Sequence, residues 1–236
     1  MAEILTRADP VPEGFTRVEA PHDGSTRIVV LSCKWAPYRL CWPAWAAAYI
    51  RHWQMPWGAL TFTHGCAWPV SAVFCEDRAQ PWGDFVAEAL AQFTEPVVLV
   101  FMADMVLTAD VDLEELIRCR REMDAEHASY YRVVPTPECD TPFAHGKGGE
   151  HKAGMYRASL QVAFWSREYL IAQARGVRTP WDFELSRPVA PAGIHLSVTR
   201  ENRPLSMAEM LTKGQWTADG LRIMSAGGWP TDGGGT

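Results

Sequence analysis

The sequence has no cysteines at metal-binding spacing and no membrane-length apolar run. Its six cysteines form no C-x-x-C pair, so neither a zinc knuckle nor a thioredoxin-like dithiol is predicted, and reduced, mostly buried thiols are expected. No run reaches the roughly 18 apolar residues of a membrane span, and the N-terminus has acids and prolines where a signal peptide has a basic end and an apolar core. We therefore expect a cytoplasmic protein without a transmembrane segment.

Several nucleotide-binding and hydrolytic motifs are also missing. There is no G-x-G-x-x-G after the first predicted strand and no G-x-x-x-x-G-K-[ST], which disfavours a dinucleotide dehydrogenase and a P-loop NTPase. The absence of G-x-S-x-G and H-E-x-x-H disfavours an α/β-hydrolase and a helix-borne zinc site. The GKGG sequence at 146–149 lacks the strand-to-helix context of a phosphate loop, so we predict a flexible loop there, with His145 and His151 exposed to solvent.

An excess of positive charge is absent as well. The chain has 22 Lys and Arg against 28 Asp and Glu, a formal net charge of −6, and its basic residues are scattered, which disfavours a role in coating nucleic acid or an anionic membrane. What it has is 47% hydrophobic residues, with eleven Trp and nine Phe. This composition indicates a folded protein, and 236 residues suit one α/β domain.

Short apolar strands alternate with amphipathic helices in the first part of the chain. Strands are predicted at 27–32, 59–63, 97–102 and 130–134. Helices are predicted over 42–53, 82–93 and 113–123. Asp112 and Glu115 have the spacing of a capping box before the third helix. The alternation is typical of βαβ units and predicts a three-layer, doubly wound, Rossmann-like α/β fold with a mostly parallel sheet.

A long polar segment at 135–154 interrupts this pattern and is predicted to be a mobile lid or binding loop. Beyond it we predict a strand over 156–165, a helix from Ser166 to Gly176, a helix starting at Thr179, a strand over 194–199 and a helix around 207–212. The predicted organisation is an irregular lead-in at 1–25, a single domain over 26–216 and a partly disordered C-terminal tail at 217–236.

Candidate ligand-binding residues follow two of the predicted strands, because ligands of open α/β sheets bind beyond the carboxyl ends of parallel strands. Ser32, Lys34 and Trp35 follow the first strand and are candidates for substrate binding. Asp104 follows the long apolar strand, where a carboxylate can hold Mg²⁺ or Mn²⁺ against a diphosphate. The alternative, that Asp104 caps the next helix or pairs with an arginine, stays open on these grounds.

Four segments, taken in order, resemble a known family. They are VVLVFMADMVLTADVD at 97–112, YRVVP at 131–135, YRASLQVAFWSREYL at 156–170 and TPWDFE at 179–184. They resemble bacterial and phage glycosyltransferase-like proteins of the GT-A type, in which a buried strand ends in an acidic D-D-[YF]-type motif and Y-R-x-S-L-Q-x-x-x-W and P-W-x-F-E segments follow. The resemblance extends from near residue 27 to near residue 216, and the order and spacing make it more specific than any single motif.

The resemblance implies a GT-A-like catalytic domain that moves a sugar from a nucleotide-diphosphate sugar to a glycan or another hydroxyl acceptor. It places Asp104 at the diphosphate and at the metal, with Mn²⁺ or Mg²⁺ as the cofactor. The side chains that it places in the cleft or around the sugar are Arg157, Ser159, Gln161, Trp165 and Trp181.

The resemblance also implies a general base. Glu184, with Asp182 as the second candidate, would deprotonate the acceptor hydroxyl as it attacks the anomeric carbon, which makes the transfer inverting. On local grounds Glu184 has an alternative role, because a carboxylate in the first turn of a helix can satisfy free backbone N–H groups.

The chain departs from the family pattern at one position. Ala103 stands where the first acid of the pair is expected, and no adjacent residue restores a D-x-D. A non-catalytic protein on the same scaffold, which binds a glycan or a partner, is therefore an alternative. A nucleotidyltransferase that makes the activated sugar ranks last, because LSCKWAPYR at 31–39 offers only Lys34 and Arg39 in place of a glycine-rich basic loop.

Overall fold

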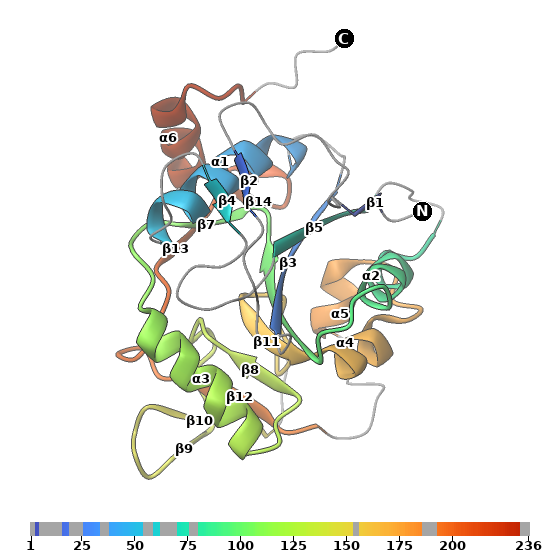
Figure 1. The fold of residues 1–236 in the computed structure, drawn as a ribbon, viewed down its shortest axis with the longest axis vertical. Coiled ribbons are helices and arrows are strands. Elements are labelled where there is room, and N and C mark those ends of the chain that lie inside the picture. The colour runs from blue at the N-terminus through green and yellow to red at the C-terminus, as the bar shows by residue number, and fades with distance from the viewer. Residues whose placement is uncertain are drawn as a thin grey trace.

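The computed structural model of the chain shows an α/β fold in which one large sheet lies between two groups of helices (Figure 1). The structure describes residues 3–4, 16–18, 26–33, 38–53, 59–61, 70–75, 80–152, 156–185 and 193–231. No helix in these ranges is long and apolar enough to cross a lipid bilayer.

Nine of the described strands form the central sheet. In spatial order they are β1 (Glu3–Ile4), β5 (Val70–Cys75), β3 (Thr26–Cys33), β6 (Val97–Met102), β11 (Ala163–Ser166), β8 (Tyr130–Arg132), β12 (His195–Val198), β10 (Gly148–Glu150) and β9 (Thr141–Pro142). β5, β3 and β6 are parallel neighbours, as are β8 and β12, and the other neighbours are antiparallel. Only β1, β10 and β11 run against the others, so the sheet is mixed but mostly parallel, as predicted.

Helices cover both faces of this sheet, which confirms the three layers. One face carries α1 (Tyr38–His52), α3 (Leu113–Ala125) and α6 (Ala218–Gly227). The other carries α2 (Trp82–Leu90), α4 (Arg167–Ala174) and α5 (Pro180–Leu185). The two groups lie on opposite sides of the strands in Figure 1.

β6 shows why a continuous apolar strand requires both layers. Leu99 and Phe101 point to the face covered by α1, and the Phe101 ring packs edge-on against Trp45 with centroids 5.6 Å apart. Val98 and Val100 point to the other face, against α2 and α4. These four residues are completely buried, and each contributes about 1.5–3 kcal/mol of hydrophobic free energy. The strand ends at residue 102, as predicted.

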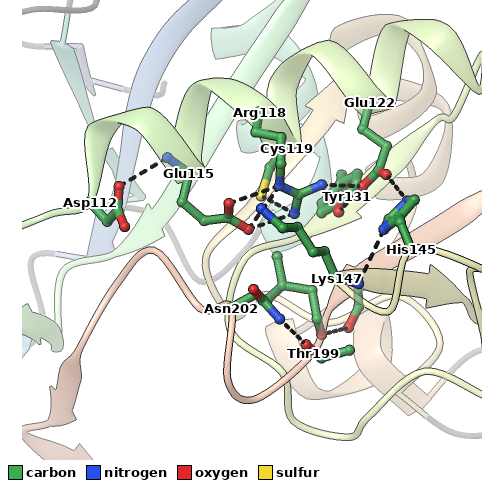
Figure 2. Close-up of polar contacts among 12 residues, drawn as sticks. Asp112, Glu115, Arg118, Cys119, Glu122, Tyr131, His145, Lys147, Thr199 and Asn202 are labelled. Carbon is green, nitrogen blue, oxygen red and sulfur yellow. Dashed lines mark hydrogen bonds and ion pairs between the residues drawn. The ribbon is translucent and has the colours of Figure 1, made fainter.

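α3 begins at the predicted capping box. The Asp112 carboxylate accepts a hydrogen bond of 3.0 Å from the Glu115 backbone N–H, which satisfies a free donor of the first turn. Further along the helix, Arg118 donates to Glu115 and Glu122 at 2.7 and 2.9 Å (Figure 2). Tyr131 of β8 donates its hydroxyl hydrogen to Glu122, so this network ties α3 to the sheet.

The segment predicted as a flexible loop at 135–154 contains the β9–β10 hairpin. His145, beside its turn, lies 2.7 Å from Glu122 of α3 (Figure 2). Gly146 has a φ of 71°, and a Cβ on Gly149 would lie 2.4 Å from the Thr141 carbonyl oxygen. The glycines of GKGG therefore permit a tight hairpin, and the prediction of a flexible loop is corrected to a β-hairpin.

The strand predicted over 156–165 is reduced to the four residues of β11. Before β11, backbone N–H groups donate to side chains and not to a neighbouring strand. The Ser159 N–H donates to the Tyr130 hydroxyl, and the Gln161 N–H donates to Ser159 Oγ at 3.1 Å. Tyr156 has a φ of 60°, in the left-handed region that strands avoid. Residues 156–162 therefore form turns and bends before β11 begins.

The helix predicted around 207–212 is wrong. Those residues form β13 (Met207–Glu209), which pairs with β7 (Met105–Leu107), and β14 (Leu211–Thr212), which pairs with β15 (Gln215–Trp216). The MAEML sequence is rich in helix-forming residues, but pairing with β7 overrides that weak local preference.

The described parts of the two predicted end segments contain regular structure. In the lead-in, β1 pairs with β5, and β2 (Thr16–Val18) pairs with β4 (Ala59–Thr61). In the C-terminal segment, α6 starts at the Thr217 hydroxyl, which accepts from the Gly220 N–H, and buries Met224 completely in the core. The folded unit therefore extends past the predicted boundary at residue 216.

Candidate functional site

A cavity of about 770 Å³ opens at the carboxyl ends of the parallel strands β3 and β6. This volume lies within the range of about 300–1,000 Å³ that is typical of small-molecule sites. Five residues predicted from the sequence line it: Ser32, Asp104, Gln161, Trp181 and Glu184. The fold thus brings together candidates from both halves of the chain, at the edge of the sheet where ligands of α/β folds bind.

Asp104 is the second residue after β6 and is 9% exposed. Burial raises the pKa of its carboxyl group from 3.8 to about 7, and the negative charge of Glu209 adds to this rise. Asp104 forms no salt bridge with the lysines and arginines that the structure describes, and Asp112 caps α3 in its place. The structural roles that the sequence left open for Asp104 are therefore not the ones it has.

Glu184 lies on α5 and is held by two donors. The Ser159 hydroxyl and the Leu160 backbone N–H each donate to Glu184 Oε1 at 2.8 Å. Ser159 is 2% exposed and reaches the cavity only through Glu184, so it is a positioning residue. Neither bond uses Oε2. The alternative role at the start of the helix is filled by Thr179 and Asp182 instead.

Besides Ser159, three predicted site residues that the structure describes do not line this cavity. Arg157 donates to the backbone oxygens of His151 and Gly193, at 3.0 and 2.8 Å, and so joins two loops. Trp165 is completely buried among aromatic rings of the core. The exposed Asp182 donates its backbone N–H to the Thr179 hydroxyl at the start of α5, and its carboxylate accepts from that hydroxyl. Lys34 and Trp35 lie outside the described residues.

Some charged residues of the cavity were not predicted from the sequence, among them Arg178, Glu209 and Lys213. Glu209 lies on β13, in the segment predicted as a helix, and Lys213 lies in the turn between β14 and β15 that follows it. The signal in the sequence is a short alternation, with Glu209 between the apolar residues Ala208 and Met210. In the structure Ala208 and Met210 are buried and Glu209 is exposed.

Two polar atoms of the cavity make no hydrogen bond with any residue that the structure describes. They are Ser32 Oγ, on a residue that is 8% exposed, and Gln161 Oε1. A buried polar group without a partner costs about 1–3 kcal/mol, which a ligand can recover by binding it. Both atoms therefore favour a polar ligand in this cavity.

A second polar cluster is buried away from the cavity. His151 Nε2 lies 2.7 Å from the Arg132 guanidinium, and His195 Nε2 lies 2.8 Å from the Tyr169 hydroxyl. Burial lowers the pKa of both histidines to about 4, so they are neutral at pH 7. The prediction that His151 is exposed is wrong, because the residue is 2% exposed and joins the β9–β10 segment to β8.

Comparisons with known proteins yield a distant structural neighbour. No family model and no curated protein matches the chain. Among solved structures, the chain is similar to A197 from STIV, with a TM-score of 0.41 and 11% sequence identity over 80% of this chain and 86% of that chain.

Proposed function

We propose that this protein is a GT-A-type glycosyltransferase that moves a sugar from a nucleotide-diphosphate sugar to an acceptor hydroxyl with inversion. One observation carries the proposal: Asp104 at the end of β6 and Glu184 on α5 line the same cavity. The family resemblance gives these two acids the two opposite roles, one toward the donor diphosphate and one toward the acceptor. Their meeting in one cavity supports that assignment.

Glu184 is the general base of the proposed reaction. Because Ser159 and Leu160 fix Oε1, the carboxylate has a defined orientation, and Oε2 can accept the proton of the acceptor hydroxyl. The acceptor oxygen then bonds to the anomeric carbon, and the bond from that carbon to the diphosphate oxygen breaks. General-base catalysis of this kind contributes a rate factor of about 10²–10⁴.

The departing diphosphate requires positive charge. Arg178 and Lys213 line the cavity and can stabilise the phosphate oxygens as negative charge develops. The carboxylate of Asp104 and the hydroxyl of Ser32 are hard oxygen donors that fit Mg²⁺ or Mn²⁺, and such a cation, when bound, neutralises the leaving group. Trp181, which is 53% exposed at the cavity, offers an aromatic face to the sugar.

The test combines binding with turnover. Thermal unfolding is measured with UDP, GDP, dTDP and CMP, with and without Mn²⁺, and the matching sugar donors are then assayed for transfer or hydrolysis. We expect one nucleotide to raise the melting temperature, since ligands that bind only the folded state stabilise it. Glu184→Gln should keep that shift and lose turnover. Glu201→Gln, an exposed acid outside the cavity, is the control. Full turnover in Glu184→Gln contradicts the base assignment.

One observation favours a second candidate function. Ala103, 2% exposed, places a methyl group where the family has an acid. A protein that has lost the transfer reaction and binds a glycan or a partner accounts for this substitution. In that case none of the four nucleotides shifts the melting temperature, with or without Mn²⁺, and none of their sugar donors is turned over.

A further inference from the structure

We propose that Glu209 supplies the second carboxylate of a divalent-cation site with Asp104, and that Mn²⁺ or Mg²⁺ binds there only together with a diphosphate. The inference rests on the proposed function and deepens it by naming a ligand that lies about a hundred residues away from the acidic motif in the sequence.

The β7–β13 ladder brings the two acids together. Glu209 lies opposite Met105, the residue after Asp104, in the antiparallel register. The Met210 N–H donates to the Asp104 carbonyl oxygen at 2.8 Å, so a backbone hydrogen bond joins the residue after Glu209 to Asp104 itself. Both side chains line the cavity, and the charge of Glu209 acts on Asp104. The acid absent at Ala103 is thus supplied in space by another strand.

Ser32 provides an independent indication of a ligand. Its hydroxyl is buried, makes no hydrogen bond with the described part of the chain and lines the same cavity. The Ala103 N–H donates to the Leu31 carbonyl oxygen at 2.9 Å, which places the end of β3 beside the turn that carries Asp104. A third oxygen donor therefore lines the cavity at the same edge of the sheet as Asp104.

The composition of the site explains why the cation needs the diphosphate. Among the described residues, no group of three or more His, Cys, Asp or Glu side chains is placed to hold a metal ion. Two carboxylates and a hydroxyl leave much of an octahedral shell unfilled, and Mg²⁺ in proteins is typically held by one or two carboxylates together with substrate phosphates. Each ligand should therefore raise the affinity for the other by the same factor.

The experiment measures binding without turnover. Pyrophosphate, and the nucleoside diphosphates UDP, GDP and dTDP, are titrated by calorimetry into the full chain with and without Mn²⁺. Electron paramagnetic resonance of free Mn²⁺ reports metal binding directly. The variants are Glu209→Gln, which removes the charge and keeps the shape, and Glu201→Gln as the control for loss of one exposed acid. Far-ultraviolet circular dichroism confirms that each variant is folded.

We expect Mn²⁺ to tighten diphosphate binding in the wild type and to bind weakly without it. Residues that merely support a metal ligand change metal affinity about 10- to 100-fold, so Glu209→Gln should reduce the Mn²⁺-dependent tightening by at least about tenfold. Its metal-free affinity for diphosphate should not fall, because a negative charge has been removed. Glu201→Gln should behave as the wild type does.

Three results overturn the inference alone, and a fourth overturns the proposed function with it. Equal Mn²⁺ dependence in Glu209→Gln and the wild type shows that Glu209 is no ligand. Tight Mn²⁺ binding without diphosphate shows that the site is complete by itself. Diphosphate binding that Mn²⁺ never affects removes the cation site and leaves the proposed transferase function standing. If no diphosphate binds the wild type under any condition, the proposed function and this inference both fail.

Discussion

Replacing Asp104 with asparagine should stabilise the protein at neutral and alkaline pH. Burial holds the pKa of this carboxyl at about 7 in the folded protein, against 3.8 for the ordinary group. The folded state therefore binds the proton more tightly, and the free energy of unfolding falls as the pH rises from about 4 to about 7. At about 1.4 kcal/mol for each pH unit between the two pKa values, the charged carboxylate costs about 4 kcal/mol above pH 7.

The Asp104→Asn side chain has nearly the same shape and no charge, so it should be more stable than the wild type by up to about 4 kcal/mol at pH 8 and nearly equal to it at pH 4. Urea unfolding at intervals from pH 4 to pH 8.5, with EDTA present to exclude divalent cations, gives both curves. Glu201→Gln corrects for the general effect of losing one negative charge. A stability difference that does not change with pH would refute the reasoning, because the penalty would not then come from ionisation.

Three further predictions follow from burial and placement. Glu184→Gln should lower turnover by about 10²- to 10⁴-fold with donor affinity kept, as measured by transfer assay and calorimetry. Trp181→Ala should weaken donor binding and change the unfolding free energy by less than about 0.5 kcal/mol, whereas the fully buried Trp165→Ala should cost about 3–5 kcal/mol of stability. Burial lowers the pKa of His195 to about 4, so this side chain takes up a proton less readily in the folded state than in the unfolded state. Its contribution to the free energy of unfolding is therefore lost as the pH falls from 6.5 toward 4. Over this interval the free energy of unfolding should fall more steeply with decreasing pH in the wild type than in His195→Gln.

The sequence predicts well where the pattern is local and the environment is uniform. The VVLVFM run correctly predicts both ends of a strand that is buried on both faces. Six consecutive apolar residues would expose apolar side chains to water if only one face of the strand were covered. Asp112 with Glu115 gave the start of α3, because the cap needs only residues that are near each other in the chain. These elements were enough to indicate an α/β fold with helices on both faces.

Prediction fails where a partner distant in the sequence decides the structure. The MAEML segment has the local preference of a helix, and only pairing with β7 makes it a strand. His151 is polar and lies in a polar segment, yet the Arg132 guanidinium and the fold of the hairpin bury it. For the same reason, Asp104 and Glu184 could be named in advance while Glu209 could not, because its place at the cavity depends on that pairing.

The shortened strand before β11 explains how the candidate base is held. If residue 160 were part of a paired strand, its backbone N–H could donate to a neighbouring strand. Because β11 begins only at Ala163, the Leu160 N–H donates to Glu184 instead. Ser159 has a double role there, since its hydroxyl accepts from the Gln161 N–H and donates to the same carboxylate oxygen. The bond that gives the Leu160 N–H a side-chain partner is thus also one of the two that orient Glu184. The local alternation of the sequence predicts a strand here. The strand is absent at the residue whose backbone N–H holds the proposed general base.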